Sequence, residues 1–438
     1  MAAEATGATL SARRRSGALD VRVLPHRSRG PAHPLLRLFA AEATYVVAQP
    51  NGDAALPASQ FSARCSEFAR AAWDAALHEI AQPPLDLARA YDTLVMERWA
   101  GAEAVALPPW ALEAFYRIRR AIPRRVQLAL RRVLIKRQGI PGFPSWPYDE
   151  SVRDLLAALI ASLVGPGQEI RFRWFWPDGA RAALALTHDV ESAAGLRNAL
   201  RVADIEAARG FRSSFNIVKS CYEVDRGILR ELVDRGFEIG VHGVWHDRSL
   251  FATRAQFDSQ QKLLREAAEE FGAVGFRSPA THRVPDWLAE LPFEYDCTVP
   301  LSDPYEPQPG GCCSPWPYFI GDMVELPWTL TQDHTLFTLL RQRDIGIWLR
   351  QVERLRDAAG FIQVLTHPDP GYLGEAGNAR LYETFLERMA EQADLWNALP
   401  RDIARWWRRR DSAERWSPRD YGTATLSPEG RIVFAGPA

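Results

Sequence analysis

From residue 181 onward, short apolar segments alternate with longer segments of helical periodicity, and this alternation constrains the fold most strongly. Seven apolar segments are candidate strands: 181–187, 213–218, 237–242, 274–278, 295–299, 323–329 and 361–367. Helical patterns follow the first three, at 195–210, 225–236 and 252–272. This alternation predicts a parallel sheet with right-handed crossovers. We therefore expect an α/β fold, and the number of strands suits a barrel-like (β/α) arrangement better than an open sheet.

The regions on either side of this alternation differ from it. We expect residues 1–20 to form a disordered tail and residues 21–175 to form a mainly helical module. Near the other end, TATLSPEGRIVFAG (423–436) places two short apolar runs around Ser-Pro-Glu-Gly, which predicts a β-hairpin. The chain is thus divided into a tail, a helical module, a barrel at 176–411 and a C-terminal tail with a hairpin at 412–438.

The overall charge excludes one class of function. Lys and Arg number 53 against 54 Asp and Glu, so the balance gives no reason to expect nucleic-acid binding. The N-terminal arginine cluster is not followed by an apolar stretch, and no window approaches the roughly 18 consecutive apolar residues of a membrane span. We expect a cytoplasmic protein, with peripheral membrane contact left open and no prediction of oligomeric state.

A basic stretch lies in the helical module at 124–137. It contains six basic side chains, those of Arg124, Arg125, Arg131, Arg132, Lys136 and Arg137. One interpretation is a solvated helix face. The other is a patch for an acidic lipid head group or a sugar-phosphate carrier.

A pair of histidines follows the third predicted strand. In VHGVWHD (241–247), His242 and His246 are four residues apart, and a turn directly after the strand would let both imidazoles reach one metal ion. Two neutral imidazoles suit zinc, and also nickel, cobalt or iron. The spacing alone also occurs by chance on protein surfaces, so the strand-end position carries the prediction.

The first predicted strand ends in LTHDVE, with carboxylates at Asp189 and Glu191. Residues two apart on an extended strand share a face, so one carboxylate could bind metal while the other accepts a proton. The alternative is that they cap the helix beginning near Ser192. His188 should face the other side of the strand, and we expect it to be structural.

Two further strand ends carry polar residues. Arg277 in GFRSPATHR could hold a base carboxylate in its charged form through a bidentate pair, or form an ordinary salt bridge. His367 in QVLTHPDPG could act as a general acid, or be a core or capping residue. Four residues in neighbouring loops are weaker candidates for substrate contacts, namely Trp245, His282, Asp303 and Asp333.

Together, the segments LTHDVE, VHGVWH, GFRSP and VLTHP resemble, in order and approximate spacing, the motifs of the polysaccharide deacetylase family, also called carbohydrate esterase family four. The resemblance covers about 176–405. It implies a distorted (β/α)7 barrel and metal-dependent removal of an acyl group from an amide-linked sugar substituent.

The resemblance also implies roles for single residues. Asp189 corresponds to the base, His242 and His246 to metal ligands, Arg277 to the residue that orients the base, and His367 to the general acid. The family's common first motif has two adjacent aspartates, whereas Val190 holds that adjacent position here. The chain therefore resembles an Asp-x-Glu branch with Glu191 as third ligand, and Asp189 as ligand is the alternative. The implied cofactor is one divalent transition metal, Zn²⁺ first, with Ni²⁺, Co²⁺ or Fe²⁺ as alternatives.

The expected function is removal of an N-acyl group, most simply N-acetyl, from a sugar unit of a polysaccharide or of its lipid- or nucleotide-linked precursor. Two alternatives remain open at this point. The same site could hydrolyse another non-peptide C–N bond, in a small amide or a formyl-sugar. Alternatively, the barrel could bind glycan without catalysis.

Overall fold

The computed structural model describes residues 87–99, 142–163, 169–412, 417–428 and 430–437, together with a few shorter pieces of the N-terminal region. Among those pieces, β1 (Arg13–Arg15) pairs with β2 (Ala18–Asp20), and β3 (Val23–Leu24) pairs with β4 (Thr44–Tyr45). Most of the predicted tail, of the predicted helical module and of the basic stretch lies outside the described residues.

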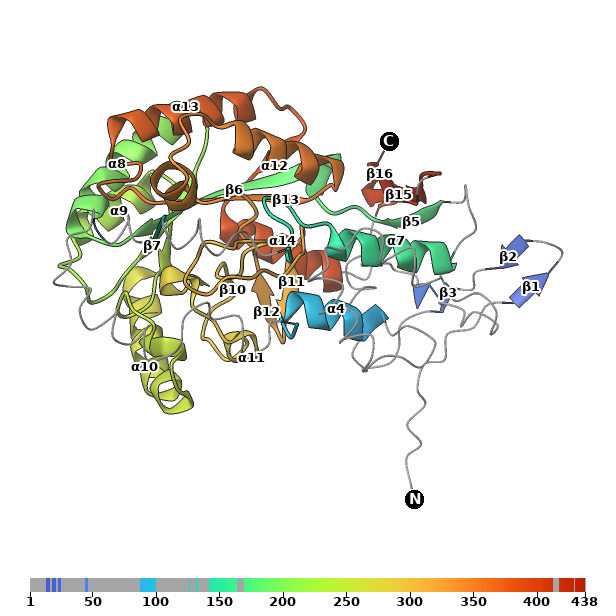
Figure 1. Cartoon of the computed structure of the whole chain (residues 1–438), viewed down its shortest axis with the longest axis horizontal. Helices are drawn as coiled ribbons and strands as arrows, with labels where there is room; N and C mark the ends of the chain where they lie inside the picture. Colours follow the sequence, from blue (N-terminus) through green and yellow to red (C-terminus); the bar gives the residue numbers. More distant parts are fainter. Residues whose placement is uncertain are drawn as a thin grey trace, which may run out of the picture.

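A curled, mostly parallel sheet forms the main body (Figure 1). Its strands run in the order β11-β12-β10-β9-β8-β7-β6-β13, and β14 also pairs with β6. The strands are β6 (Ala182–Val190), β7 (Ser213–Ile217), β8 (Glu238–Val241), β9 (Gly275–Phe276), β10 (Tyr295–Asp296), β11 (Tyr318–Ile320), β12 (Met323–Glu325), β13 (Phe361–Thr366) and β14 (Leu395–Asn397). All seven predicted strand segments are therefore strands, while β11 and β14 were not predicted.

The longest strand, β6, lies at the centre of this arrangement. Every residue of β6 is buried, as expected for a strand of a parallel sheet that is covered on both faces. It pairs in parallel with β13 on one side and with β7 and β14 on the other. Because neighbouring strands are parallel, their carboxyl ends meet at one edge, where the polar strand ends predicted from the sequence are brought together.

The chain after β12 closes the curled sheet on the side between β10 and β13. Leu326 N donates to Asp296 O at 2.8 Å, and Leu330 N donates to Gln363 O at 3.1 Å. The segment 326–330 thus bonds to both strands. The expected distorted (β/α)7 barrel is confirmed.

Helices surround the sheet, and capping residues mark where some of them begin or end. The longer ones are α8 (Ala193–Ala207), α9 (Arg226–Asp234), α10 (Arg254–Phe271), α12 (Gly346–Asp357), α13 (Ala376–Ala390) and α14 (Pro400–Ser412). Short helical turns occur at α11 (Pro285–Leu288), η3 (Pro177–Gly179), η4 (Ser249–Phe251), η5 (Pro279–Thr281), η6 (His334–Leu339) and η7 (Pro418–Asp420). The side chain of Ser192 caps α8, and Gly272, in the left-handed region at φ 63°, ends α10.

A small second sheet joins the segment just before β6 to the C-terminal hairpin. The predicted hairpin is present as β15 (Tyr421–Leu426) and β16 (Ile432–Ala435). Its strand β15 also pairs with β5 (Ile170–Arg173), which comes from the stretch expected to be mainly helical. The helix α7 (Ser151–Leu163) lies beside this sheet (Figure 1).

The helix α4 (Leu87–Val95) lies against the barrel rather than apart from it. Tyr318 donates through its hydroxyl to Val95 O at 3.1 Å, and Arg98 Nη2 lies 2.9 Å from Asp286 Oδ1. Within the described part of the chain, no helix is both long and apolar enough to span a membrane.

Candidate active site

Three side chains at the ends of two strands, β6 and β8, form a group that could hold a metal ion. Glu191 directly follows β6, while His242 and His246 follow β8. One ligand atom from each lies within 4.8 Å of the other two. Glu191 Oε1 is 2.9 Å from His246 Nε2. The residues predicted as ligands are therefore brought together.

The chemistry of this group fits a divalent metal. His242 Nδ1 lies 3.0 Å from the backbone carbonyl of Arg277, so its proton is donated there and Nε2 carries the lone pair. Burial lowers the pKa of His242 to about 4, which keeps the imidazole neutral. The Nε2 atom of His242 is buried without a hydrogen-bond partner among the described residues, whereas that of His246 faces Glu191 Oε1 at 2.9 Å. One unpaired imidazole nitrogen, a second imidazole and a carboxylate together match a zinc-type donor set.

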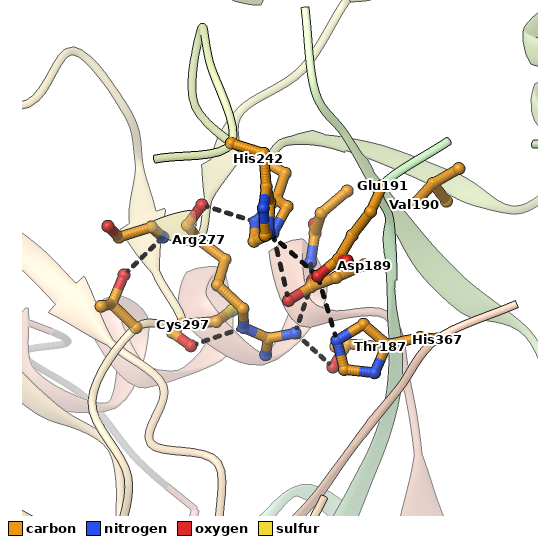
Figure 2. Close-up of polar contacts among 12 residues, drawn as sticks. Thr187, Asp189, Val190, Glu191, His242, Arg277, Cys297 and His367 are labelled. Carbon is orange, nitrogen blue, oxygen red and sulfur yellow. Dashed lines mark hydrogen bonds and ion pairs between the residues drawn. The ribbon is translucent and has the colours of Figure 1, made fainter. Parts of the chain in front are cut away.

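Asp189 lies deeper than Glu191, on the inner face of β6 (Figure 2). Its Oδ1 accepts hydrogen bonds from Asn216 Nδ2 at 2.8 Å and from Arg277 Nη1 at 3.1 Å. Its Oδ2 is 3.7 Å from His242 Nε2. Burial alone would raise the pKa of Asp189, but its interactions with His242, Arg277 and His367 outweigh burial and lower it. The carboxylate is thus held ionised, with Oδ2 facing the ligand group.

The alternative that the two carboxylates cap the following helix is wrong. The N-cap of α8 is Ser192, whose hydroxyl accepts from Gly195 N at 3.1 Å. Figure 2 shows Glu191 and Asp189 directed toward His242 and His367, whereas Val190 between them points away. The alternation of β6 therefore places the two carboxylates on one face, as expected for an extended strand.

Arg277 is fully buried and contacts Asp189, but through one nitrogen only, so the expected bidentate pair is wrong. Its Nη1 also donates to Thr187 Oγ1 at 2.9 Å, and its Nε donates to the Cys297 carbonyl at 2.7 Å. The guanidinium divides its donors between Asp189 and these two acceptors because all three lie within hydrogen-bond distance of it. The contact with Arg277 holds the Asp189 carboxylate in place.

His367 stands on the other side of the ligand group, at the end of β13. Its Nε2 is 3.7 Å from Glu191 Oε1, and its Nδ1 is 2.7 Å from Asp333 Oδ1. Burial alone would lower the pKa of His367, but Asp333 and Glu191 outweigh burial and raise it to about 10. The ring is therefore protonated at neutral pH.

Asp333 was predicted as a substrate contact, and its position favours another role. It is fully buried behind His367. Its Oδ1 accepts from His334 N at 2.7 Å, and its Oδ2 accepts from His367 N at 2.9 Å. With both oxygens occupied, Asp333 orients His367 rather than reaching substrate.

The other weak candidates fall in different environments. Asp303 is buried, and its Oδ1 accepts from the backbone N–H groups of Tyr305 and Glu306, so it shapes a turn. Burial lowers the pKa of His282 to about 4. Trp245 is 42% exposed beside His246, and its role in binding sugar stays a prediction.

Two residues that position the site were not predicted from the sequence. Asn216, in β7, pairs with Gly240 of β8, and a Cβ at position 240 would collide with Asn216 Oδ1. Asp369, two residues after His367, accepts from Glu191 N at 3.0 Å through Oδ2 and from the Ser192 hydroxyl through Oδ1. Both carried a signal: Asn216 is polar within a buried strand, and Asp369 lies at a strand end like the residues that were chosen.

Two arginines of the basic stretch are described, and both contact the barrel. Arg131 Nη2 donates to the Tyr305 carbonyl at 2.5 Å, and Arg132 Nη2 donates to the Thr338 carbonyl at 2.6 Å. These two side chains are therefore neither a purely solvated face nor a free patch. The other four basic residues of the stretch lie outside the described residues.

No protein-family model and no curated protein matches the chain. Among solved structures, a protein assigned as a polysaccharide deacetylase from Mycobacterium smegmatis is 24% identical, with a TM-score of 0.44, covering 56% of this chain and 96% of that chain. Puue allantoinase is 18% identical, with a TM-score of 0.44, covering 55% of this chain and 94% of that one. A family 4 carbohydrate esterase from Streptomyces lividans, in complex with acetate, is 16% identical, with a TM-score of 0.33, covering 50% and 93%. Each of these three structures is less than 25% identical to the chain.

Proposed function

We propose that the chain is a metal-dependent hydrolase that removes an N-acyl group, most simply N-acetyl, from a sugar unit of a polysaccharide or its precursor. One observation carries the proposal. The Glu191, His242 and His246 group has an ionised, anchored carboxylate on one side and a protonated histidine on the other. This is the arrangement that amide hydrolysis needs, with a base for the attacking water and an acid for the leaving amine.

Glu191, His242 and His246 would hold the metal, which supplies Lewis acidity to polarise the acyl carbonyl and to ease the ionisation of water. The geometry supports Glu191 over Asp189 as the carboxylate ligand. Asp189 Oδ1 is occupied by Asn216 and Arg277, whereas Glu191 Oε1 is directed at His246. The chain would then belong to an Asp-x-Glu branch, with Zn²⁺ as the first expectation.

Each remaining side chain has a defined task in the reaction. Asp189 accepts a proton at Oδ2 from the water that attacks the amide carbon. Arg277 keeps Asp189 charged and in place. His367, held by Asp333, gives a proton to the departing nitrogen as the C–N bond breaks. The products are a carboxylic acid and a free amine.

A substrate panel tests this proposal. Metal-loaded protein is incubated with neutral N-acetylated hexosamines, their oligomers, a formyl-sugar and small non-sugar amides, and the released acid is quantified. Release from the N-acetylated sugars supports the proposal. Release from the small amides alone would assign the site to another C–N bond, and release from none would contradict the proposed activity.

A further inference from the structure

A second group of polar side chains lies beside His367, outside the proposed metal ligands. Glu306 is 9% exposed. Its Oε1 lies 2.8 Å from Gln332 Nε2, 3.5 Å from Arg131 Nη2 and 3.6 Å from His334 Nδ1. We refer to Arg131, Glu306, Gln332 and His334 as the Glu306 cluster. Within the described part of the chain, its hydrogen bond and ion pairs end on Oε1, so Oε2 retains its capacity to accept.

The Glu306 cluster is fixed relative to the proposed general acid. Asp333 Oδ1 accepts from His334 N and also contacts His367 Nδ1, each at 2.7 Å. The ring of Tyr372 contacts both imidazoles, with centroid distances of 5.7 Å to His334 and 4.9 Å to His367. Asp333 and Tyr372 therefore hold the side chain of His334 close to that of His367.

The cluster contains a polar atom that the described residues leave unsatisfied. His334 is 8% exposed, and its Nε2 is buried without a hydrogen-bond partner among them. Leaving such an atom unpaired costs free energy, so its retention points to a ligand. His334 Nδ1 lies 3.6 Å from Glu306 Oε1, and a proton held on Nδ1 beside this carboxylate leaves Nε2 as an acceptor.

The charges of the cluster select the kind of ligand. Two acceptors, Glu306 Oε2 and His334 Nε2, call for a partner that donates twice, as neighbouring hydroxyl groups do. A phosphate or carboxylate would be repelled by Glu306, since Arg131 is already engaged with Glu306 and the Tyr305 carbonyl. Neutral sugar hydroxyls fit both conditions.

We propose that Glu306 and His334 form a subsite for the hydroxyl groups of a neutral sugar unit bound next to the scissile amide, and so select carbohydrates over simple amides. The subsite rests on the proposed function and deepens it. It also gives Arg131 a task, because this side chain lies 3.5 Å from Glu306 Oε1 and helps to hold it.

The test compares Glu306→Ala with Glu294→Ala, a matched control at an exposed pair with Arg405. Binding of neutral N-acetylated hexosamine oligomers to metal-loaded protein is measured by calorimetry. We expect Kd to rise by at least about tenfold for Glu306→Ala, the scale of one hydrogen bond to a charged group, and to stay unchanged for Glu294→Ala. Turnover should show the same rise in KM with little change in kcat, and acetanilide, which lacks hydroxyls, should be unaffected.

The outcomes separate the subsite from the proposed function, since binding is measured without turnover. Sugar binding that depends on Glu306 but is followed by no hydrolysis would remove the function and keep the subsite. Hydrolysis with an unchanged Kd and KM in Glu306→Ala would remove the subsite alone. Wild-type protein that binds none of the oligomers would also overturn the subsite. If Glu306→Ala does not fold, Glu306→Gln, which keeps the size of the side chain, replaces it.

Discussion

Two adjacent residues of β6 face opposite sides of the sheet, and their surroundings differ in one respect. On the outer face, His188 is fully buried, with Nε2 2.8 Å from Glu206 Oε1 and Nδ1 2.7 Å from Thr366 Oγ1. Glu206 also accepts from the hydroxyls of Ser213 and Tyr382. On the inner face, Asp189 Oδ2 lies 3.7 Å from His242 Nε2, which has no hydrogen-bond partner in the described chain.

The comparison shows which property separates a structural polar site from a ligand site. Both faces are buried, and both combine carboxylates with histidines. Hydrogen-bond satisfaction differs: the His188 network is complete, whereas His242 Nε2 on the inner face is unpaired in the described chain. We therefore expect changes on the outer face to alter stability, and changes on the inner face to alter metal binding and turnover.

The largest expected effect is on the inner face. Asp189→Asn keeps the shape of the side chain but removes the base, so kcat should fall by about 10³-fold, within the usual range for general-base loss. Metal content should stay close to wild type, whereas the melting temperature should fall because the buried Arg277 loses its charged partner. Steady-state kinetics with elemental analysis measures both, and a variant with wild-type kcat would contradict the role of Asp189.

The outer face should respond in the opposite way. Glu206→Ala leaves His188, Ser213 and Tyr382 with a lost partner in a fully buried site, so we expect a loss of about 3–5 kcal/mol in the free energy of unfolding. Denaturant unfolding measures this loss. The metal affinity of the folded fraction should be unchanged, and weakened affinity with intact stability would reverse the comparison.

Glu238, at the start of β8, allows a buried structural carboxyl group to be compared with Glu191 through the pH dependence of stability. Glu238 accepts a hydrogen bond from the Tyr295 hydroxyl, and burial raises the pKa of Glu238 from 4.5 to about 7. By contrast, the neighbouring histidines lower the pKa of Glu191 against the effect of burial. The folded state therefore holds a proton that the unfolded chain releases above its own pKa. The stability that this proton provides is complete below about pH 4.5 and is lost as the pH rises through 7.

The Glu238→Gln variant has no such proton. The difference in unfolding free energy between this variant and wild type should change by roughly 3 kcal/mol from pH 4.5 to pH 8, which corresponds to the shift in pKa. Denaturant unfolding over this range measures it. A difference that does not vary with pH would show that Glu238 is not protonated in the folded protein.

The smallest expected effect concerns the support of Glu191. Asp369→Ala removes the acceptor of the Glu191 N–H, so the end of β6 loses one anchor. Metal affinity should weaken by about tenfold, as for other groups that orient a ligand. Competition with a chelator measures it. Asp369→Asn, which can still accept, should recover most of the affinity, and equal loss in both variants would argue for a general structural role.

The sequence predicted the strands and the strand-end residues because both depend on local pattern. Buried parallel strands such as β6 and β13 are continuous apolar runs, and polar residues at their ends stand out. Parallel pairing then brings Glu191, His242 and His367 to one edge without further information. His188 was expected to be structural from strand alternation alone, and its network agrees.

What the sequence did not predict depends on contacts between distant segments. The pairing of β5 with β15 joins residues about 250 positions apart, and no local pattern indicates it. Asn216 and Asp369 act only through neighbours supplied by other strands. The single contact between Arg277 and Asp189 was misjudged because the competing acceptors, Thr187 and the Cys297 carbonyl, become visible only in the folded chain.

The central claim is that the inner face of the barrel edge binds a transition metal through Glu191, His242 and His246. The most direct measurement is elemental analysis of purified protein, comparing wild type, His246→Ala and Asp189→Asn after equal exposure to Zn²⁺. We predict about one metal ion per chain in wild type and in Asp189→Asn, and none retained in His246→Ala. Equal metal content in wild type and His246→Ala, or no metal bound by wild type, would contradict the account.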